Sequence, residues 1–486
     1  MWFDKLTTNV IILLCVSYII AHLYSLTEDL LRQNTKLCEG DYIVWQRFVL
    51  RQYLNVYRFD NWIKRHFTLT GHIFITFMIA SAVFGVDTRQ STTYQLFVFL
   101  LVVLIFSLLG GVFNRLRVSM TRQLPRYGTV GEPLRYSVTL TNLTPRIYDR
   151  LALIEPLAET LPSPAQLQQF YSLHNEPWFK RGISFRQWMR YLSIQRGGVI
   201  EEIAVPRLGL SPVQVTNSFI PTRRGVIHFA PSSVAKPDLL GLFRRLITVD
   251  EPQSCIILPK RYAIKPLNLT GRRQYQSGGV SLANSVGNSS EFMALRDYQQ
   301  GDPLHSIHWK SYAKHGKLIV KDYQDEYFVR RALVLDTFVG IANREQFEAA
   351  VSVAASLATS EQDDEALLDL LFVGLQSYCF TAGRGVDQVT HLQEILASVQ
   401  ASSETSFELL QQTVLARLAL CSSLLCVLMH WDEARQNFIQ QLMAHGLPVA
   451  VFLLHDGSLT LANCPKKPPH FYLLDYRQLA EQLAGL

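Results

Sequence analysis

Two long stretches without formal charge constrain this chain more than any other feature of its sequence. Residues 67–86 (FTLTGHIFITFMIASAVFGV) carry no acidic or basic side chain apart from His72, and residues 94–113 (YQLFVFLLVVLIFSLLGGVF) carry none. Each stretch has about 20 residues, enough for a helix to cross a hydrocarbon layer about 30 Å thick. A pair of buried core helices is the alternative, but such helices rarely stay uncharged on every face over this length. The sequence therefore predicts a transmembrane helical hairpin at 67–113.

Residues 6–26 form a third apolar stretch within an N-terminal segment, 1–66. Polar side chains interrupt it at Asn9, Ser17 and His22, and no small-residue cleavage pattern of a signal peptide follows it. We expect this stretch either to cross the membrane or to lie along its surface as a helix. Residues 27–66 mix charged side chains with aromatic ones, which suits the headgroup layer of a membrane. These aromatic residues are Tyr42, Trp45, Tyr53, Tyr57 and Trp62.

The charges that flank the hairpin predict its orientation. Arg58, Lys64 and Arg65 precede it, and Arg115, Arg117, Arg122 and Arg126 follow it with no acidic residue before Glu132. Because basic residues accumulate on the cytoplasmic side of membrane helices, both ends of the hairpin are expected in the cytoplasm.

A β-rich region is predicted for residues 115–262. Short stretches such as GEPLRYSVTLTNLT, RGVIHFAPSSV and SCIILPK alternate polar and apolar residues between Pro and Gly, a pattern typical of an antiparallel β-sandwich. Residues 158–196 break this rhythm and read as a surface insertion, partly helical around FRQWMRYLSIQ. The insertion is interpreted as a variable loop or as a surface for a partner.

The last part of the chain predicts a linker and then an α/β domain. Residues 263–330 begin with a Gly-, Ser- and Asn-rich stretch that lacks apolar periodicity. Because such a stretch cannot form a hydrophobic core, we expect it to be a linker. From 331 to 486, apolar runs such as LLCVLM and VAVFLL alternate with helical patterns, as in a parallel sheet covered by helices on both faces. The predicted fold class is therefore a multidomain membrane protein with transmembrane helices, a β-sandwich-like domain and a doubly wound α/β domain.

The stretch GDPLHSIHWK, residues 301–310, admits two interpretations. Asp302 followed by Pro303 is a typical helix start and Gly316 a typical helix end, which predicts a helix over 303–315. Alternatively, His305 and His308 could bind a metal ion beside Asp302, which would favour a metal-dependent hydrolase. The chain contains no H-E-x-x-H pattern, so the helix start is the preferred interpretation.

Residues 289–326 (SSEFMALRDYQQGDPLHSIHWKSYAKHGKLIVKDYQDE) resemble the signature of the domain-of-unknown-function 58 family, and RRGVIHFAPSSVAKPDLLGLFRR resembles an upstream element of that family. The resemblance implies a membrane-anchored protein with a β domain and a C-terminal domain like von Willebrand factor type A. Family members often accompany MoxR-type AAA+ ATPases, and their own biochemical activity is largely undefined. The motif residues expected to form contacts are Glu291, Phe292, Leu295, Arg296, Tyr298, Gly301, Asp302, His308, Trp309 and Lys310. Among them, Trp309 is expected as a buried anchor and Arg296 as a bidentate donor.

Magnesium-binding domains of the von Willebrand type use Asp-x-Ser-x-Ser after the first strand and an aspartate after a later one. Here Asp336 matches, but Phe338 and Gly340 stand where the two serines would be. Asp432, Thr337 and Thr381 could supplement Asp336 as oxygen ligands. The preferred interpretation is a degenerate site in which Asp336 and Asp432 cap the following helices, and no cofactor is expected.

Composition and motifs narrow the classes of function. The net charge of +6 on 486 residues, without a basic stripe, argues against nucleic acid as a partner, and the sequence contains no phosphate-binding loop and no G-x-S-x-G elbow. We therefore expect a non-enzymatic adaptor in the bacterial cytoplasmic membrane, with its soluble domains in the cytoplasm. The family resemblance implies a MoxR-type AAA+ ATPase as its partner.

Overall fold

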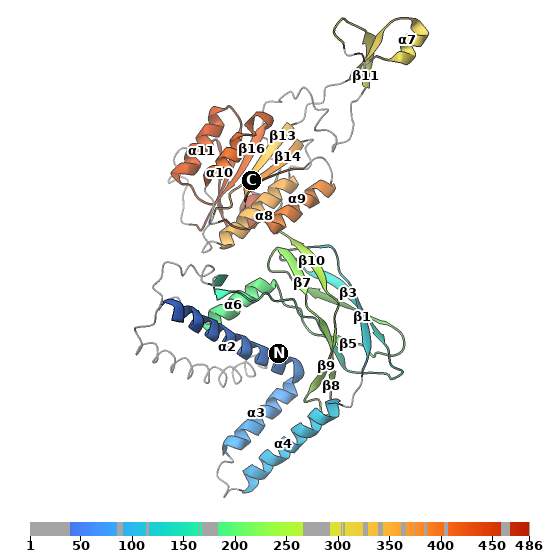
Figure 1. Ribbon diagram of the computed structural model, residues 1–486, viewed down its shortest axis with the longest axis vertical. Helices are drawn as coiled ribbons and strands as arrows, with labels where there is room; N and C mark the ends of the chain where they lie inside the picture. Colours follow the sequence, from blue (N-terminus) through green and yellow to red (C-terminus); the bar gives the residue numbers. More distant parts are fainter. Residues whose placement is uncertain are drawn as a thin grey trace. The chain divides into compact units, whose positions relative to one another are not determined.

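The computed structural model divides the chain into two compact units, Met1–Leu258 and Pro259–Leu486 (Figure 1). The structure describes residues 39–84, 91–112, 116–164, 166–167, 183–265, 292–302, 304, 307–323, 329–338, 344–360, 366–374, 376–382, 386–402, 407–457 and 467–485. The predicted stretch 6–26 lies outside these residues. The expected multidomain α/β organisation is confirmed at this level.

Three helices open the described part of the first unit: α2 (Glu39–His66), α3 (Leu69–Phe84) and α4 (Ser91–Val112). Among the described residues, one helix is long and apolar enough to cross a membrane, with a mean hydropathy of 2.3 over Thr92–Leu109. The apolar part of α3, Leu69–Ala82, is shorter. Helices α3 and α4 pair, and the Ser81 hydroxyl donates to the carbonyl of Thr93 over 3.0 Å. Large apolar side chains such as Phe77, Phe99 and Phe106 point away from the protein and stay exposed.

Helix α6 (Phe185–Arg196), from the predicted insertion, packs against α2 and forms a small core of its own. A capping box between Ser184 and Gln187 starts the helix, and Gly197 in the left-handed conformation ends it. Trp188 packs edge-to-face on Tyr57 at 5.5 Å between ring centroids. Tyr53 and Tyr57 are therefore buried by protein, which corrects their expected place in the headgroup layer.

The strands of the first unit form three sheets. They are β1 (Val118–Gln123), β2 (Tyr127–Thr129), β3 (Leu134–Asn142), β4 (Leu151–Ile154), β5 (Ile203–Val205), β6 (Val213–Phe219), β7 (Gly225–Phe229), β8 (Ser232–Pro237), β9 (Arg244–Val249) and β10 (Gln253–Leu258). The sheet orders are β1-β3-β6, β2-β10-β7 and β5-β4-β8-β9. All named pairs are antiparallel except β2 with β10. Alternate residues of β3 face one shared core, as the polar–apolar alternation predicts.

An ion pair lies inside this β-rich core. The Arg122 Nε donates to Glu155 over 2.8 Å, and both side chains are fully buried. Tyr136 and Asn217 donate to the other Glu155 oxygen over 2.8 and 3.1 Å, and Arg122 also donates to the Ser232 hydroxyl. Burial, followed by the charge of Glu155, raises the pKa of Tyr136 far above its usual value. Arg122 is thus a core residue, which removes it from the flanking charges used to predict orientation.

The second unit contains a six-stranded sheet in the order β15-β14-β13-β16-β17-β18. The strands are β13 (Val329–Leu335), β14 (Ala366–Val373), β15 (Ser377–Ala382), β16 (Ser423–Leu428), β17 (Val449–His455) and β18 (His470–Asp475). Only β15, at one edge, is antiparallel to its neighbour. The unit begins before the predicted linker, because Tyr262 and Ile264 already pack against its core and the Tyr262 amide donates to Ser356 over 2.8 Å.

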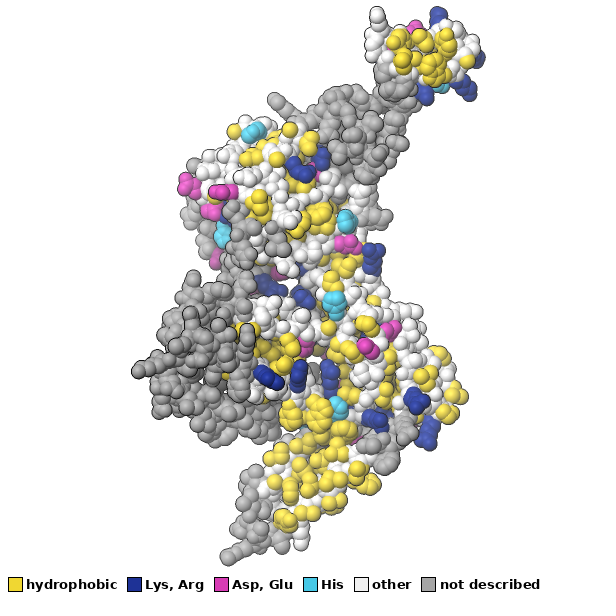
Figure 2. Space-filling model, in the orientation of Figure 1, with side chains coloured by type: hydrophobic (Ala, Val, Ile, Leu, Met, Phe, Trp, Pro, Cys, Tyr) yellow, Lys and Arg dark blue, Asp and Glu magenta, His cyan; other side chains and the backbone are white. Residues whose placement is uncertain are grey.

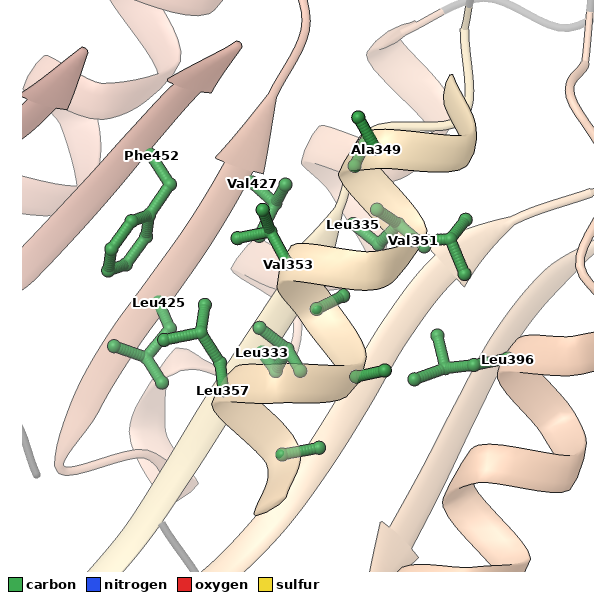
Figure 3. Close-up of a cluster of buried hydrophobic side chains, with 14 of the residues drawn as sticks. Leu333, Leu335, Ala349, Val351, Val353, Leu357, Leu396, Leu425, Val427 and Phe452 are labelled. Carbon is green, nitrogen blue, oxygen red and sulfur yellow. The ribbon is translucent and has the colours of Figure 1, made fainter. Parts of the chain in front are cut away.

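Helices cover both faces of this sheet (Figure 1). They are α8 (Arg344–Ser360), α9 (Val386–Ser398), α10 (Phe407–Leu415), the 3-10 turn η7 (Leu418–Leu420), α11 (Glu433–Ala444) and α12 (Leu479–Ala484). Leu333, Leu335 and Val427 point toward α8, as Figure 3 shows, whereas Val334 and Cys426 face the core formed with α10 and α11. Strands β16 and β17 are mainly apolar because neither face of the sheet meets water.

We expect Arg122→Met to lower the stability of the β-rich core by about 3–5 kcal/mol, because Glu155 then stays buried without its cation. The double variant Arg122→Met/Glu155→Leu should recover most of this loss, since no charge remains in the core. Hydrogen exchange of the β3 and β6 amides in the full chain measures both effects. Equal protection in the single and double variants would contradict this account.

Candidate functional site

The centre of the parallel sheet offers the first candidate site. Strand order reverses between β13 and β16, and open α/β sheets bind ligands beyond the carboxyl ends of their strands at such a switch point. Asp336 follows β13 there and is completely buried. Its amide donates to the carbonyl of Val427 over 2.9 Å, and its Oδ1 accepts from the Phe338 amide over 3.0 Å. Asp336 therefore holds the turn after β13.

The guanidinium of Arg435, from α11, lies between the two predicted metal candidates. Its Nε donates to Asp336 Oδ2 over 2.7 Å, and a terminal nitrogen donates to Asp432 Oδ2 over 2.5 Å. Asp432 also caps α11 by accepting from the Arg435 amide over 3.0 Å. The guanidinium carbon stands 4.7 Å from the ring centre of Phe407, and the side chain is almost wholly buried.

Electrostatics favour this internal arrangement. Burial acts to lower the pKa of Arg435, but Asp336 and then Asp432 outweigh it, so the pKa is raised above its usual value. The hydroxyl of Thr337 donates to the carbonyl of Val373, and Thr381 accepts from Arg330 over 3.2 Å. Each oxygen group proposed as a metal ligand thus has a protein partner. In the described part of the chain, no group of three or more His, Cys, Asp or Glu residues could hold a metal ion.

The second candidate site is the small module that carries the predicted motif. It consists of β11 (Phe292–Asp297), β12 (Ile319–Tyr323) and the short helix α7 (Trp309–His315), with β11 and β12 antiparallel. Gly316 ends α7 in the left-handed conformation, as the sequence predicts.

The predicted α-helix over 303–315 is shorter in the structure, because α7 begins at Trp309. The Arg296 guanidinium donates two hydrogen bonds to the Asp302 carboxylate, over 2.7 and 2.8 Å. The Gln299 amide donates a third over 2.9 Å. Ile307 forms a bridge with Val320, and the His308 amide donates to the carbonyl of Ile319 over 2.8 Å. Ile307 and His308 therefore pair with β12 inside the range where an α-helix was expected. The bidentate role predicted for Arg296 agrees with these contacts.

The structure distributes the other motif residues unevenly. Glu291 and His305 lie outside the described residues, as does the side chain of Phe292. Gly301 adopts a φ of 114°, which favours glycine. The ring Nδ1 of His308 lies 2.5 Å from the Ser311 hydroxyl. Trp309 is 60% exposed, which corrects its expected role as a buried anchor.

Large apolar side chains instead gather on the surface of this module. Trp309 packs edge-to-face against Tyr312, with ring centroids 6.1 Å apart, and the second ring is 43% exposed. We call the exposed set the apolar face of the module: Leu295, Leu304, Trp309, Tyr312 and Leu318. Figure 2 shows apolar side chains gathered on this part of the chain with basic side chains around them. The basic residues Lys310, Lys314 and Lys317 are exposed.

Sequence reasoning missed Arg435 and the pair of Arg330 with Asp369. The Arg330 Nε donates to Asp369 over 2.7 Å, and the carboxylate is buried in the middle of β14. A charged residue inside an otherwise apolar strand, as in ALLDLLFV, was the available signal, since a buried carboxylate requires a partner. For Arg435 the signal was weaker, namely an arginine three residues after a helix-capping aspartate.

Comparison with known proteins confirms the family resemblance over part of the chain. The model of the family described as "Protein of unknown function DUF58" matches residues 294–419. This match includes most of β11, helix α7 and the sheet as far as α10. The uncharacterized protein YeaD of Bacillus subtilis (strain 168) is 26% identical over 178 residues. The match covers 36% of this chain and 42% of the relative, so it spans less than half of the relative's length.

Solved structures add only distant likenesses. The CARDB domain of a Pyrococcus furiosus protein, in complex with di-metal ions, is 10% identical, with a TM-score of 0.17. It covers 29% of this chain and 93% of its own. A Clostridium perfringens cohesin module of a family 33 glycoside hydrolase is also 10% identical, with a TM-score of 0.16 and coverages of 29% and 98%. Scores this low carry no argument about fold or function.

We expect Arg435→Ala to lower the stability of the α/β sheet by about 3–5 kcal/mol, because it leaves Asp336 buried without a cation. Hydrogen exchange of the β13 and β16 amides measures the effect. The control Arg477→Ala removes an exposed guanidinium and should leave this exchange unchanged. Indistinguishable exchange in the two variants would contradict a structural role for the Arg435 cluster.

The pKa of Asp302 predicts a pH dependence for the module. The Arg296 hydrogen bond, followed by that from the Gln299 amide, lowers this pKa from its ordinary value of 3.8. The ionised Asp302 carboxylate therefore stabilises the module fully above pH 3.8. This stabilisation is lost as the pH falls through the lower pKa that Asp302 has in the folded protein. In a chain with isotope-labelled glutamine, the Gln299 amide resonance should shift in that acidic range. Asp302→Asn should abolish this shift, and its persistence would contradict the assignment.

Proposed function

We propose that this protein is a non-enzymatic adaptor anchored in the bacterial cytoplasmic membrane, whose second unit binds a protein partner. The observation that carries the proposal is the apolar face of the module, with two exposed aromatic rings inside the stretch that matches the family model. Tryptophan and tyrosine are the residues most enriched where protein interfaces concentrate their binding energy. Soluble surfaces rarely expose such side chains in a group without a binding role.

The membrane part of the proposal rests on the first unit. Helix α4 has the length and hydropathy of a membrane span, and the exposed Phe99 and Phe106 on it would contact lipid. We propose that α3 crosses with it as a hairpin and that the stretch 6–26 adds a further span or a surface helix. Without Arg122, the cytoplasmic orientation rests on the other flanking charges, which are Arg58, Lys64, Arg65, Arg115, Arg117 and Arg126.

The α/β unit is proposed to be a domain like von Willebrand factor type A without a working metal site. Its strand order with one antiparallel edge strand supports a doubly wound domain, and Asp336 follows the first strand as such a site requires. Arg435 places one positive charge between Asp336 and Asp432, where a divalent ion would otherwise bind. An internal cation favours a domain that binds its partner without magnesium.

The partner proposed from the family resemblance is a MoxR-type AAA+ ATPase. Trp309, Tyr312 and their apolar neighbours would fill a hydrophobic groove on it, and Lys310, Lys314 and Lys317 favour acidic residues around that groove. The alternative is a metal-dependent hydrolase that uses residues 302–308. It requires Asp302 to leave Arg296 and His308 to leave Ser311, so the contacts give it less support.

We expect Trp309→Ala to weaken binding of an AAA+ ATPase by about 30-fold or more, because truncating a central aromatic anchor costs about 2 kcal/mol or more. The experiment is a pull-down of the full chain from solubilised membranes, followed by titration of the recovered ATPase. Met443→Ala is the matched control, since it removes an exposed apolar side chain of the same unit outside the module. Failure of the unaltered chain to recover any AAA+ protein, or equal binding by both variants, would contradict the proposal.

A further inference from the structure

The loop between β8 and β9 places two leucines at the corner of a hairpin, where polar residues and glycine usually stand. We call this loop, Asp238–Phe243, the hairpin tip. The Asp238 amide donates to the carbonyl of Phe243 over 2.9 Å, and the Gly241 amide donates back to Asp238 over 3.3 Å. Gly241 has a φ of 70°, which closes the turn. Leu239 is 92% exposed and Leu240 is 50% exposed, whereas Leu242 is buried.

Helices α3 and α4 fix the hairpin tip at their ends. The hydroxyls of Thr68 and Thr70 donate to the carbonyl of Gly241, and the Thr68 amide donates to that of Leu242 over 3.2 Å. The Ser107 hydroxyl, near the end of α4, donates to the Asp238 carboxylate. A side chain at Gly71 would meet the Leu242 carbonyl oxygen at 2.2 Å, so glycine is required for this approach. The tip is therefore held at the depth where the apolar part of α4 ends.

Aromatic and basic residues adjoin the tip. Phe59, Trp62, His66 and Phe243 form a stacked series with centroid separations of 6.3, 4.9 and 5.6 Å, and the first two rings are exposed. Arg244 donates to the carbonyl of Lys64 over 3.0 Å and thereby joins β9 to the end of α2. In Figure 1, α2 runs across the α3–α4 pair rather than along it. Exposed aromatic rings beside basic side chains are typical of a membrane–water interface.

We infer that the hairpin tip is a lipid-contacting anchor: Leu239 and Leu240 enter the boundary between headgroups and acyl chains of a phospholipid bilayer. Continuity with α3 and α4 selects lipid as the occupant, because the tip is held at the ends of these apolar helices. The inference rests on the proposed membrane anchoring by α4. It adds that the β-rich region itself touches the bilayer, which fixes its orientation at the surface.

The test places a diazirine amino acid at position 239 of the full chain, reconstituted in vesicles of phosphatidylcholine and phosphatidylglycerol, and detects lipid adducts by mass spectrometry. Position 220 is the matched control, because Ile220 is also exposed but follows β6 at the end that pairs with the start of β3. Position 99 on α4 tests the membrane anchor itself. We expect about tenfold more lipid adduct at 239 than at 220, since an interfacial side chain is surrounded by lipid.

The outcomes separate this inference from the proposed function. Adducts at 99 and 239 but not at 220 support both. Adducts at 99 with none at 239, or with equal amounts at 239 and 220, overturn the hairpin-tip anchor while the α4 anchor stands. No adduct at any of the three positions overturns the membrane proposal, and this inference with it.

Discussion

A guanidinium group buried beside a carboxylate recurs in both units: Arg122 with Glu155 in the β-rich core, and Arg435 with Asp336 at the switch point of the α/β sheet. Removing either charge from water is costly, and the Coulomb attraction repays that cost only when geometry and further hydrogen bonds are favourable. Tyr136, Asn217 and Ser232 complete the shell around the first pair. Asp432 and the ring of Phe407 do so around the second. The packing of both cores depends on these shells being complete.

The Arg435 cluster also determines what chemistry the α/β unit can offer. Carboxylates at the carboxyl end of parallel strands are well placed to bind a cation. In this chain the positive charge beside these carboxylates is the guanidinium of Arg435, a side chain of the neighbouring helix α11. Because the guanidinium donors point at both aspartates, each carboxylate has an internal partner. Interaction with another molecule is then expected from exposed surfaces, of which the apolar face of the module is the most distinctive.

The two exposed apolar surfaces have different surroundings, and this difference underlies their different proposed occupants. The first covers α3, α4 and the hairpin tip, and it includes Phe99 and Leu239. It continues along helices that expose large apolar side chains over much of their surface, so a bulk apolar medium fits it. The second is small, lies around Trp309 and Tyr312, and is rimmed by lysines. A limited patch of aromatic rings with a charged rim fits a protein groove.

Errors at the level of single residues share one cause. Asp302 and Pro303 have the local chemistry of a helix start, but Arg296 binds the carboxylate, and Ile307 and His308 pair with β12 before α7 begins. Arg122 looks like a charge at the membrane surface, but on strand β1 its side chain points into the β-rich core. Tyr53 and Tyr57 look like interfacial residues, but α6 of the predicted insertion covers them. In each case a partner distant in sequence outweighs the local preference.

The sequence by itself determined the apolar helices, the alternation of the β strands and the doubly buried strands of the α/β unit. It could do so because hydrophobic periodicity is a local property of a segment and reports whether water meets one face, both faces or neither. Only the tertiary structure decided which charges pair, which aromatic rings stay exposed and where the hairpin tip rests. Those outcomes depend on contacts such as Asp336 with Arg435 and Gly241 with Thr68, which join residues far apart along the chain. Desolvation and hydrogen bonding act at distances of a few ångströms in space, whatever the separation in sequence.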